Sequence, residues 1–369
     1  MSSQPQTREF FERLVATGRG DAATYLALAR ECARTRDHAA ALAAVDRALA
    51  LEPRNLLALI VKADQLAALG DERSASSFYR AAANLAPSAR EMPAAVRDEV
   101  ARAASMCERY AQRFERHLRE RLGRHLVTGS RFNDSLDILS GKKSVYFQEP
   151  RVYFLPGLPQ LQFYPREPFP WLERLEAATQ DIRAELLNIL KEDSAFSPYI
   201  RRSDRRPHLD AAGLLENPAW SAFYLWQHGE LVQENAARCP RTVRALDGVP
   251  FASVKNRSPS VMFSLLKPGA HIPPHTGEVN TRLVCHLPLI VPENCHLRVG
   301  NETRQVVAGQ AWLFDDTIEH EAWNRSNQTR VILLFEVWRP ELTDEERAQV
   351  AALFEAIDAY GGPASAFPG

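Results

Sequence analysis

The first third of the chain repeats itself with a period of 34 residues, and this repetition restricts the fold more than any other feature. Shifting the sequence by 34 residues places identical residues on one another at five positions: Ala29 on Ala63, Ala41 on Ala75, Ala48 on Ala82, Leu51 on Leu85 and Pro53 on Pro87. Small residues at matching positions let two helices approach closely, and a proline stops a helix before the next unit begins. The period therefore predicts antiparallel helix pairs that stack on one another.

These helix pairs resemble tetratricopeptide repeats over residues 22–89. Val45 and Tyr79 are large residues at matching positions and would fill the space between helices. Gly70 stands where that repeat usually ends its first helix, whereas Arg36 stands at the corresponding place of the earlier unit. An alanine-rich helical bundle without a true repeat is the alternative.

The composition changes after this helical part. Two repeats alone bury little surface, so the helical stretch from Met92 to Leu126 is expected to cap them. From about Gly129 aromatic residues and prolines become frequent, and residues 171–193 space their apolar positions as a helix does. We therefore predict a helical domain over residues 1–128 and a second domain over residues 129–369.

Strand-like blocks dominate the region from Ser260 to Pro340. They are VMFSLLK, TRLVCHLPLIV, CHLRVG, RQVVAGQAWLF and RVILLFEVW, and Pro-Gly, Pro-Glu-Asn, Gly-Asn and Asp-Asp turn signals separate them. Several short antiparallel strands in so short a stretch suggest a jelly-roll barrel, also called a double-stranded β-helix. The expected fold class is therefore α+β, with an α-helical repeat domain followed by a jelly-roll domain.

Composition narrows the setting in which the protein works. Lys and Arg number 45 against 46 Asp and Glu, and this near-neutral balance gives no electrostatic reason to expect nucleic acid or an anionic membrane as a partner. Five cysteines without a CxxC pair indicate reduced thiols rather than disulfides. No secretory signal is visible, and the apolar runs fall far short of the roughly 20 residues of a membrane span. We therefore expect a soluble, cytoplasmic protein.

Two histidines and an arginine follow one another in an order that suits an iron site. His275 lies in the proline-rich turn HIPPHTG, His320 stands at a strand end 45 residues later, and Arg330 opens a strand ten residues further on. A jelly roll brings strands that are distant in sequence to one mouth, and neutral imidazoles suit iron(II). If 2-oxoglutarate chelates that iron, an arginine offers its far carboxylate a forked pair of donors that stays charged when buried.

The segment from Phe263 to Thr343 resembles the aspartyl/asparaginyl β-hydroxylase family. HTG, RLxxHL, the paired aspartates of FDD, the EHE triplet and the closing VWRPELT carry the similarity, which continues more weakly into PGLPQLQFYP. Tetratricopeptide repeats also precede the oxygenase in members of that family. The resemblance implies a dioxygenase that depends on Fe(II), 2-oxoglutarate and O2. It also implies hydroxylation of an unactivated carbon, the β-carbon of an Asp or Asn residue in a peptide or protein that the repeats would help to bind.

The resemblance also implies roles for particular residues. His275 and His320 would bind the iron. Arg330 and Ser264 would hold the far carboxylate of 2-oxoglutarate, and His286 would lie near its keto acid end. Because these positions come from matching motifs, they are expectations about where the side chains meet.

Two positions bear on the ligand set and on the substrate. Most iron oxygenases of this cofactor class carry a carboxylate where this chain has Gly277. The hydroxylase family also lacks this carboxylate. Without an anionic ligand at this position, iron affinity should be weaker. Protein-modifying members carry a second arginine where this chain has Val284, and only Arg282 remains. Arg282 is thus either a clamp for a substrate carboxylate or part of an ordinary surface ion pair.

Other functions stay open. The substrate could be a small molecule or an acyl chain. The HxG pattern also leaves room for a halide ligand, as in iron halogenases. A protein of a different class would be a repeat-based scaffold whose barrel is catalytically silent and only binds a partner.

Nearby polar residues have alternative interpretations as well. Asp315 and Asp316 either accept hydrogen bonds that orient His320 or cap the turn before it, and a direct iron ligand from Asp316 is a third alternative. His271 and His296 are interpreted as structural histidines.

Overall fold

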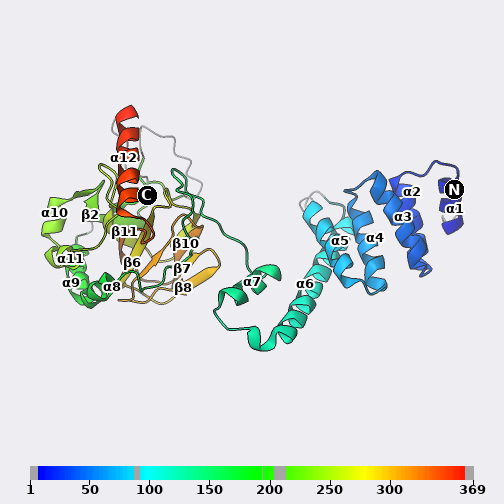
Figure 1. The fold of residues 1–369 in the computed structure, drawn as a ribbon, viewed down its shortest axis with the longest axis horizontal. Coiled ribbons are helices and arrows are strands. Elements are labelled where there is room, and N and C mark those ends of the chain that lie inside the picture. The colour runs from blue at the N-terminus through cyan, green and yellow to red at the C-terminus, as the bar shows by residue number, and fades with distance from the viewer. Residues whose placement is uncertain (1–6, 87–91, 193, 203–212, 362–369) are drawn as a thin grey trace. The chain divides into compact units, whose positions relative to one another are not determined.

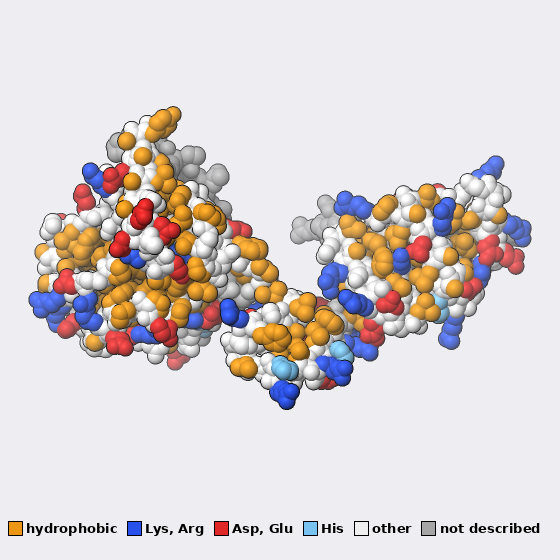
Figure 2. Space-filling model, in the orientation of Figure 1, with side chains coloured by type: hydrophobic (Ala, Val, Ile, Leu, Met, Phe, Trp, Pro, Cys, Tyr) orange, Lys and Arg blue, Asp and Glu red, His pale blue; other side chains and the backbone are white. Residues whose placement is uncertain are grey.

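The computed structural model describes residues 7–86, 92–192, 194–202 and 213–361. The chain forms two compact units, Met1–Lys143 and Ser144–Gly369 (Figure 1). In the part that the structure describes, the first unit is helical, and the second is built on β-sheets. On the face shown in Figure 2, acidic and basic side chains are interspersed on both units.

Four helices form two pairs that follow each other at the predicted interval. They are α2 (Ala22–Arg34), α3 (His38–Leu51), α4 (Leu56–Ala68) and α5 (Glu72–Leu85). The six matched alanines are fully buried, and so are the large residues Val45 and Tyr79. Pro87 lies outside the described residues. The predicted helix pairing is thus present, while the assignment to the tetratricopeptide family stays a prediction.

The turn inside each helix pair explains how the repeat tolerates Arg36. Arg36 has a φ of 61° and Gly70 a φ of 87°, so both occupy the left-handed region. This conformation costs an arginine on the order of 1 kcal/mol. The next residue in each unit, Asp37 or Asp71, accepts a hydrogen bond from a backbone N–H of the following helix. Such an N-cap stabilises a helix by about 1 kcal/mol and offsets the strain.

Further helices extend this unit at both ends. They are α1 (Arg8–Ala16), α6 (Ala94–Leu122), the short 3-10 helix η1 (Gly123–His125) and α7 (Arg131–Leu139). Helix α6 contacts α5, in the capping position expected for residues 92–126. The first unit continues past residue 128 because α7 is tied to α6, where Arg119 Nη2 lies 2.6 Å from Asp137 Oδ1. Lys142 Nζ also lies 2.5 Å from Glu115 Oε1.

Two antiparallel sheets form the second unit. Their eight central strands are β4 (Val261–Leu266), β5 (His271–His275), β6 (Arg282–Ile290), β7 (Cys295–Val299), β8 (Glu302–Gln305), β9 (Trp312–Phe314), β10 (His320–Asn324) and β11 (Arg330–Trp338). One sheet has the order β4-β11-β6-β9, and the other has the order β5-β10-β7-β8. This distribution of eight strands over two sheets is that of a jelly roll, as predicted.

Three further strands extend the larger sheet beyond β4. They are β1 (Ser197–Pro198), β2 (Trp220–Gln227) and β3 (Glu230–Leu231). Helices α8 (Trp171–Ala177), α9 (Thr179–Ile189), α10 (Gln233–Ala237) and α11 (Pro240–Ala245) gather beside this sheet (Figure 1). Apolar residues of α8 and α9 share one core with β4, β6 and β11. A second core lies between the two sheets.

The prediction of one helix over residues 171–193 is wrong in detail, because the chain breaks at Ala178 into α8 and α9. The Thr179 hydroxyl donates to the backbone carbonyl of Glu176 at 2.6 Å, a local bond that competes with helix continuation. Helix α12 (Asp344–Gly361) follows the last strand. Among the described residues, no helix is both long and apolar enough to cross a bilayer. The five cysteines are free thiols.

Candidate functional site

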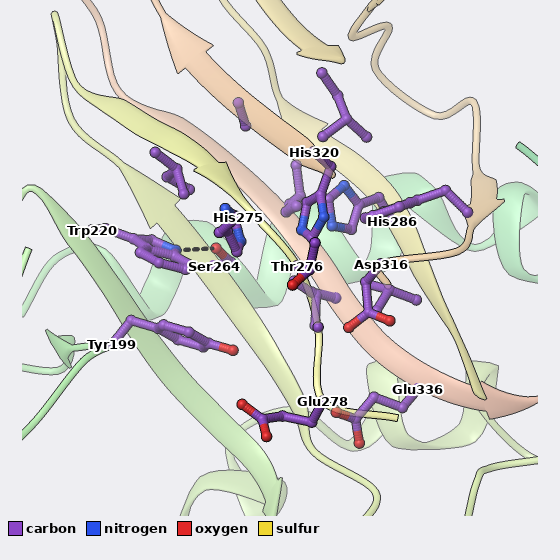
Figure 3. A pocket seen from close by; sticks show the side chains of 18 of the residues that line it. Tyr199, Trp220, Ser264, His275, Thr276, Glu278, His286, Asp316, His320 and Glu336 are labelled. Carbon is purple, nitrogen blue, oxygen red and sulfur yellow. Dashed lines mark hydrogen bonds between the residues drawn. The ribbon is translucent and has the colours of Figure 1, made fainter. Parts of the chain in front are cut away.

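A pocket opens between the two sheets of the second unit (Figure 3). Side chains alternate between the two faces of a strand, so every second residue of β6 and β11 faces the pocket. These residues are Arg282, Val284 and His286 on β6, and Arg330, Ile332, Leu334 and Glu336 on β11. Charged side chains therefore stand at the two ends of β11, with apolar side chains between them.

His275 and His320 meet in this pocket. His275 is the last residue of β5 and His320 is the first residue of β10, and the two are paired across these antiparallel strands. Their ring centroids lie 4.1 Å apart, with 50° between the ring planes (Figure 3). The sheet thus brings together two imidazoles that are 45 residues apart in the sequence.

Backbone carbonyls determine which nitrogen of each imidazole is protonated. The Nδ1 of His275 lies 2.7 Å from the Pro273 carbonyl oxygen, and the Nδ1 of His320 lies 3.1 Å from the Ile318 carbonyl oxygen. A carbonyl only accepts, so each Nδ1 carries the hydrogen and each Nε2 keeps its lone pair. Burial lowers the pKa of both rings, that of His320 well below its usual range. Both imidazoles are therefore neutral bases near pH 7, the form that binds a divalent metal.

Gly277 and Asp316 share one volume beside the histidines. Among the described residues, no three His, Cys, Asp or Glu side chains are grouped so as to hold a metal. A Cβ added to Gly277 would lie 2.1 Å from Asp316 Oδ2, so the aspartate fills the space that a side chain at 277 would need. Burial raises the pKa of Asp316 to about 7. Its Oδ1 is buried and has no hydrogen-bond partner in the described part of the chain, and the residue lines the pocket.

The opposite end of the pocket contains a buried arginine. Arg330 is 2% exposed, and in the described part of the chain its Nε has no hydrogen-bond partner. Burial lowers its pKa to about 10, so the guanidinium is still charged at neutral pH. A buried charge without a counter-ion costs several kcal/mol. This end of the pocket is therefore suited to an anion.

Neighbours of Arg330 supply further polar groups. Ser264 lies on β4, and its Oγ accepts a hydrogen bond of 3.2 Å from the indole N–H of Trp220. The hydroxyl proton of Ser264 remains available to a ligand. Burial and the charge of Arg330 lower the pKa of His286 well below its usual range, so its ring is neutral. Ser264, His286 and Arg330 all line the same pocket, as the family resemblance implies.

Arg282 is not part of a surface ion pair, and that alternative is wrong. It is 5% exposed, because it faces inward from β6, and its Nη1 lies 2.5 Å from Glu336 Oε1. Its Nη2 lies 3.9 Å from Asp316 Oδ2. Glu336 Oε2 also accepts a hydrogen bond of 3.0 Å from the Ser260 backbone N–H. Arg282 thus belongs to a buried charge network in the pocket wall.

Asp315 has a structural position next to the site. Its Oδ1 accepts hydrogen bonds from the backbone N–H and the hydroxyl of Thr317, and it forms a fully buried ion pair of 2.9 Å with Arg339. The aspartate therefore caps the turn before His320. His320 Nδ1 donates its hydrogen bond to the backbone carbonyl of Ile318.

Sequence reasoning missed two aromatic residues of the pocket. Tyr199 and Trp220 stack with their ring centroids 4.1 Å apart, and Trp220 lies 6.4 Å from the His275 ring (Figure 3). No local motif marks either residue. The pairing of β2 with β4 positions Trp220, and the Tyr199 backbone N–H donates to the Trp220 carbonyl. The two histidines interpreted as structural lie elsewhere: His271 pairs with Glu321, and His296 stacks on Trp323.

Comparisons with known proteins agree with the motif resemblance. The family model for aspartyl/asparaginyl β-hydroxylase matches residues 176–340. The human aspartyl/asparaginyl β-hydroxylase is 38% identical over 141 residues, which are 38% of this chain and 18% of that protein. Aspartate β-hydroxylase domain-containing protein 2 of Xenopus tropicalis is 33% identical over 211 residues, 56% of this chain and 55% of that protein.

One bacterial relative carries the name of a lipid-modifying enzyme. The ornithine lipid ester-linked acyl 2-hydroxylase of Rhizobium tropici is 34% identical over 180 residues, 48% of this chain and 60% of that protein. The chain thus spans between 18% and 60% of the length of these three relatives. The similarity to the aspartyl/asparaginyl β-hydroxylase family lies in residues 176–340, within the C-terminal unit.

Proposed function

We propose that the C-terminal unit is an Fe(II)- and 2-oxoglutarate-dependent dioxygenase that hydroxylates an unactivated carbon. Its substrate is an Asp or Asn side chain of a peptide or protein. The observation that carries this proposal is the pair of neutral histidines, His275 and His320, in one pocket with the buried and charged Arg330. The match of residues 176–340 to the family model for aspartyl/asparaginyl β-hydroxylase supports the hydroxylase chemistry.

The residues present fit both the metal and the oxoacid. The free Nε2 lone pairs of His275 and His320 would hold iron(II), and the remaining ligand positions are left to the oxoacid and water. Arg330 and the hydroxyl of Ser264 would hold the far carboxylate of 2-oxoglutarate through charge-assisted hydrogen bonds. His286 would lie near its keto acid end.

When bound, iron and 2-oxoglutarate supply the activation of dioxygen, and the oxoacid is converted to succinate and carbon dioxide. The protein contributes orientation and a dry pocket. The carbonyls of Pro273 and Ile318 hold the two imidazoles in one tautomer and one orientation. Val284 and Leu334 place apolar surface between the charged ends of the pocket, which limits access of water to the reacting carbon.

The test is turnover by the purified chain of 369 residues. With iron(II), 2-oxoglutarate and oxygen, we expect succinate release, and we expect one added oxygen atom on peptides that contain Asp or Asn, measured by mass spectrometry. A chelator should abolish both signals. Assays with and without chloride separate hydroxylation from halogenation. Absence of succinate under every condition would overturn the proposal in favour of a silent binding scaffold.

Hydroxylation of an acyl chain is a second candidate. The similarity to the lipid hydroxylase of Rhizobium tropici favours it. So do Val152 and Phe154, which are 47% and 51% exposed and follow the pocket residue Arg151 within three positions of the sequence. Oxygen added to an acyl ester, with none added to any peptide, would replace the peptide reading with this one.

A further inference from the structure

The charges that line the wall of the pocket are already paired with one another. Arg151 Nη2 lies 2.6 Å from Glu278 Oε1, and Arg282 Nη1 lies 2.5 Å from Glu336 Oε1. Asp316 adds one more carboxylate to the same wall. Apart from Arg330 at the oxoacid end, each arginine among the described lining residues therefore has a carboxylate of the protein beside it.

The partner of Arg282 is held firmly in place. The side chains of Arg282 and Glu336 are 7% and 10% exposed, and the second oxygen of Glu336 accepts the Ser260 backbone N–H. An incoming carboxylate would have to displace this buried glutamate, which leaves an uncompensated buried charge and costs several kcal/mol. It would also approach Asp316, 3.9 Å from Arg282 on its other side.

Closer to the histidines, the wall is apolar. Between Arg282 and His286, the inward residue of β6 is Val284, and between Arg330 and Glu336 the inward residues of β11 are Ile332 and Leu334. A carboxylate placed against these side chains would lose its hydration without gaining a counter-charge. An uncharged amide loses far less, because it carries no charge that must be stripped of water.

We propose that the group admitted next to the histidine pair carries no negative charge, so that the enzyme prefers an asparagine side chain to an aspartate side chain in the same peptide. This preference rests on the proposed function and specifies its substrate. A site whose arginines are already paired with carboxylates discriminates against the acid through repulsion and desolvation rather than through shape, because the two side chains have nearly equal size.

The test compares peptides that are identical except for one Asn or Asp, taken from the panel used for turnover. Their binding is measured with manganese(II) and N-oxalylglycine in place of iron and 2-oxoglutarate, and their kcat/KM is measured with the native cofactors. We expect the Asn peptide to be favoured at least about tenfold in both. Equal values, a preference for Asp, or no response to either peptide would overturn the inference. Succinate released without any peptide is measured in the same preparation, and its absence would indicate that the proposed function itself is wrong.

Variants of the wall provide the reciprocal test. Glu336→Gln removes the carboxylate opposite Arg282, and we expect it to shift the Asn-to-Asp ratio about tenfold toward Asp. Glu302→Gln is the matched control, since Glu302 pairs with Arg304 at the surface, outside the pocket, and should leave the ratio unchanged. If Glu336→Gln fails to fold, Val284→Lys takes its place. This variant adds a cation to the apolar wall and should shift the Asn-to-Asp ratio in the same direction. An unchanged ratio in a folded Glu336→Gln or Val284→Lys protein would contradict the proposal.

Discussion

Two buried arginines stand at opposite ends of the same pocket, and their surroundings differ. Arg282 lies 2.5 Å from Glu336, whereas Arg330 forms no ion pair with any described residue. Both are at most 5% exposed. The paired arginine is part of the wall, because its charge is already neutralised by the protein. The arginine without a partner is suited to a ligand, because only an anion from outside removes the free-energy cost of burying it.

The largest expected effect concerns the metal between these two ends. His275→Ala and His320→Ala should each abolish iron-dependent succinate release, because either change removes one of only two protein ligands proposed for the iron. The release is measured with saturating 2-oxoglutarate, and a circular dichroism spectrum and an unchanged thermal unfolding midpoint serve as controls for folding. Full activity in either variant would contradict the metal assignment.

The two arginines themselves should respond differently to substitution. Arg330→Ala should weaken 2-oxoglutarate binding by about 2–5 kcal/mol, the usual loss when one partner of a buried charge-assisted pair is removed. Arg282→Ala is the matched variant and should change oxoacid affinity by less than about threefold, because Arg282 lies at the other end of the pocket. Calorimetric titration with manganese(II) present measures both affinities. Equal losses of 2-oxoglutarate affinity in the two variants would contradict the proposed difference between Arg330 and Arg282.

Acid should destabilise the protein through the neutral histidines. Burial lowers the folded-state pKa of His286 and His320, whereas unfolded histidines bind protons below a pH of about 6.5. Unfolding in acid therefore takes up protons, and the free energy of unfolding should fall as the pH drops through that value, by up to about 1.4 kcal/mol per histidine and pH unit. Urea unfolding between pH 7.5 and 5.5 measures the slope, which His286→Asn should reduce. Asp316, whose pKa burial raises to about 7, opposes this slope because its carboxyl group takes up a proton in the folded state. The measurement is therefore repeated in Asp316→Asn, where a free energy that rises toward low pH would show that the rings are charged in the folded state.

The smallest effect expected here arises where Gly277 and Asp316 share space. Gly277→Ala should destabilise the protein by about 1–3 kcal/mol, because its Cβ would lie 2.1 Å from Asp316 Oδ2. Urea unfolding measures this difference. The double variant Gly277→Ala with Asp316→Ala should lose less stability than the sum of the single variants, since it removes the clash. Strict additivity would show that the two residues do not compete for the same volume.

Periodicity and motif spacing predicted the parts of the fold that depend on local patterns. The 34-residue repeat placed two helix pairs, and the apolar blocks placed the strands of the jelly roll. The spacing of His275, His320 and Arg330, together with the family resemblance, identified residues that do line one pocket. Each of these signals lies within one element or at a fixed distance along the chain.

Cross-strand relationships could not be read in the same way. The Glu336 partner of Arg282 depends on the register between β6 and β11, and the bond from Trp220 to Ser264 depends on the register between β2 and β4. The residue pattern within one strand does not determine which residues of the neighbouring strand lie opposite. The break at Ala178 was missed for a related reason, since the apolar spacing of α8 and α9 continues across it.

The most direct measurement of the central claim is the visible charge-transfer absorption that arises when 2-oxoglutarate chelates iron(II) in the absence of oxygen. The wild-type chain should develop this band, His275→Ala and His320→Ala should not, and Arg330→Ala should need a far higher oxoacid concentration. A wild-type chain without the band, or histidine variants that retain it, would contradict the assignment of these residues to iron and oxoacid.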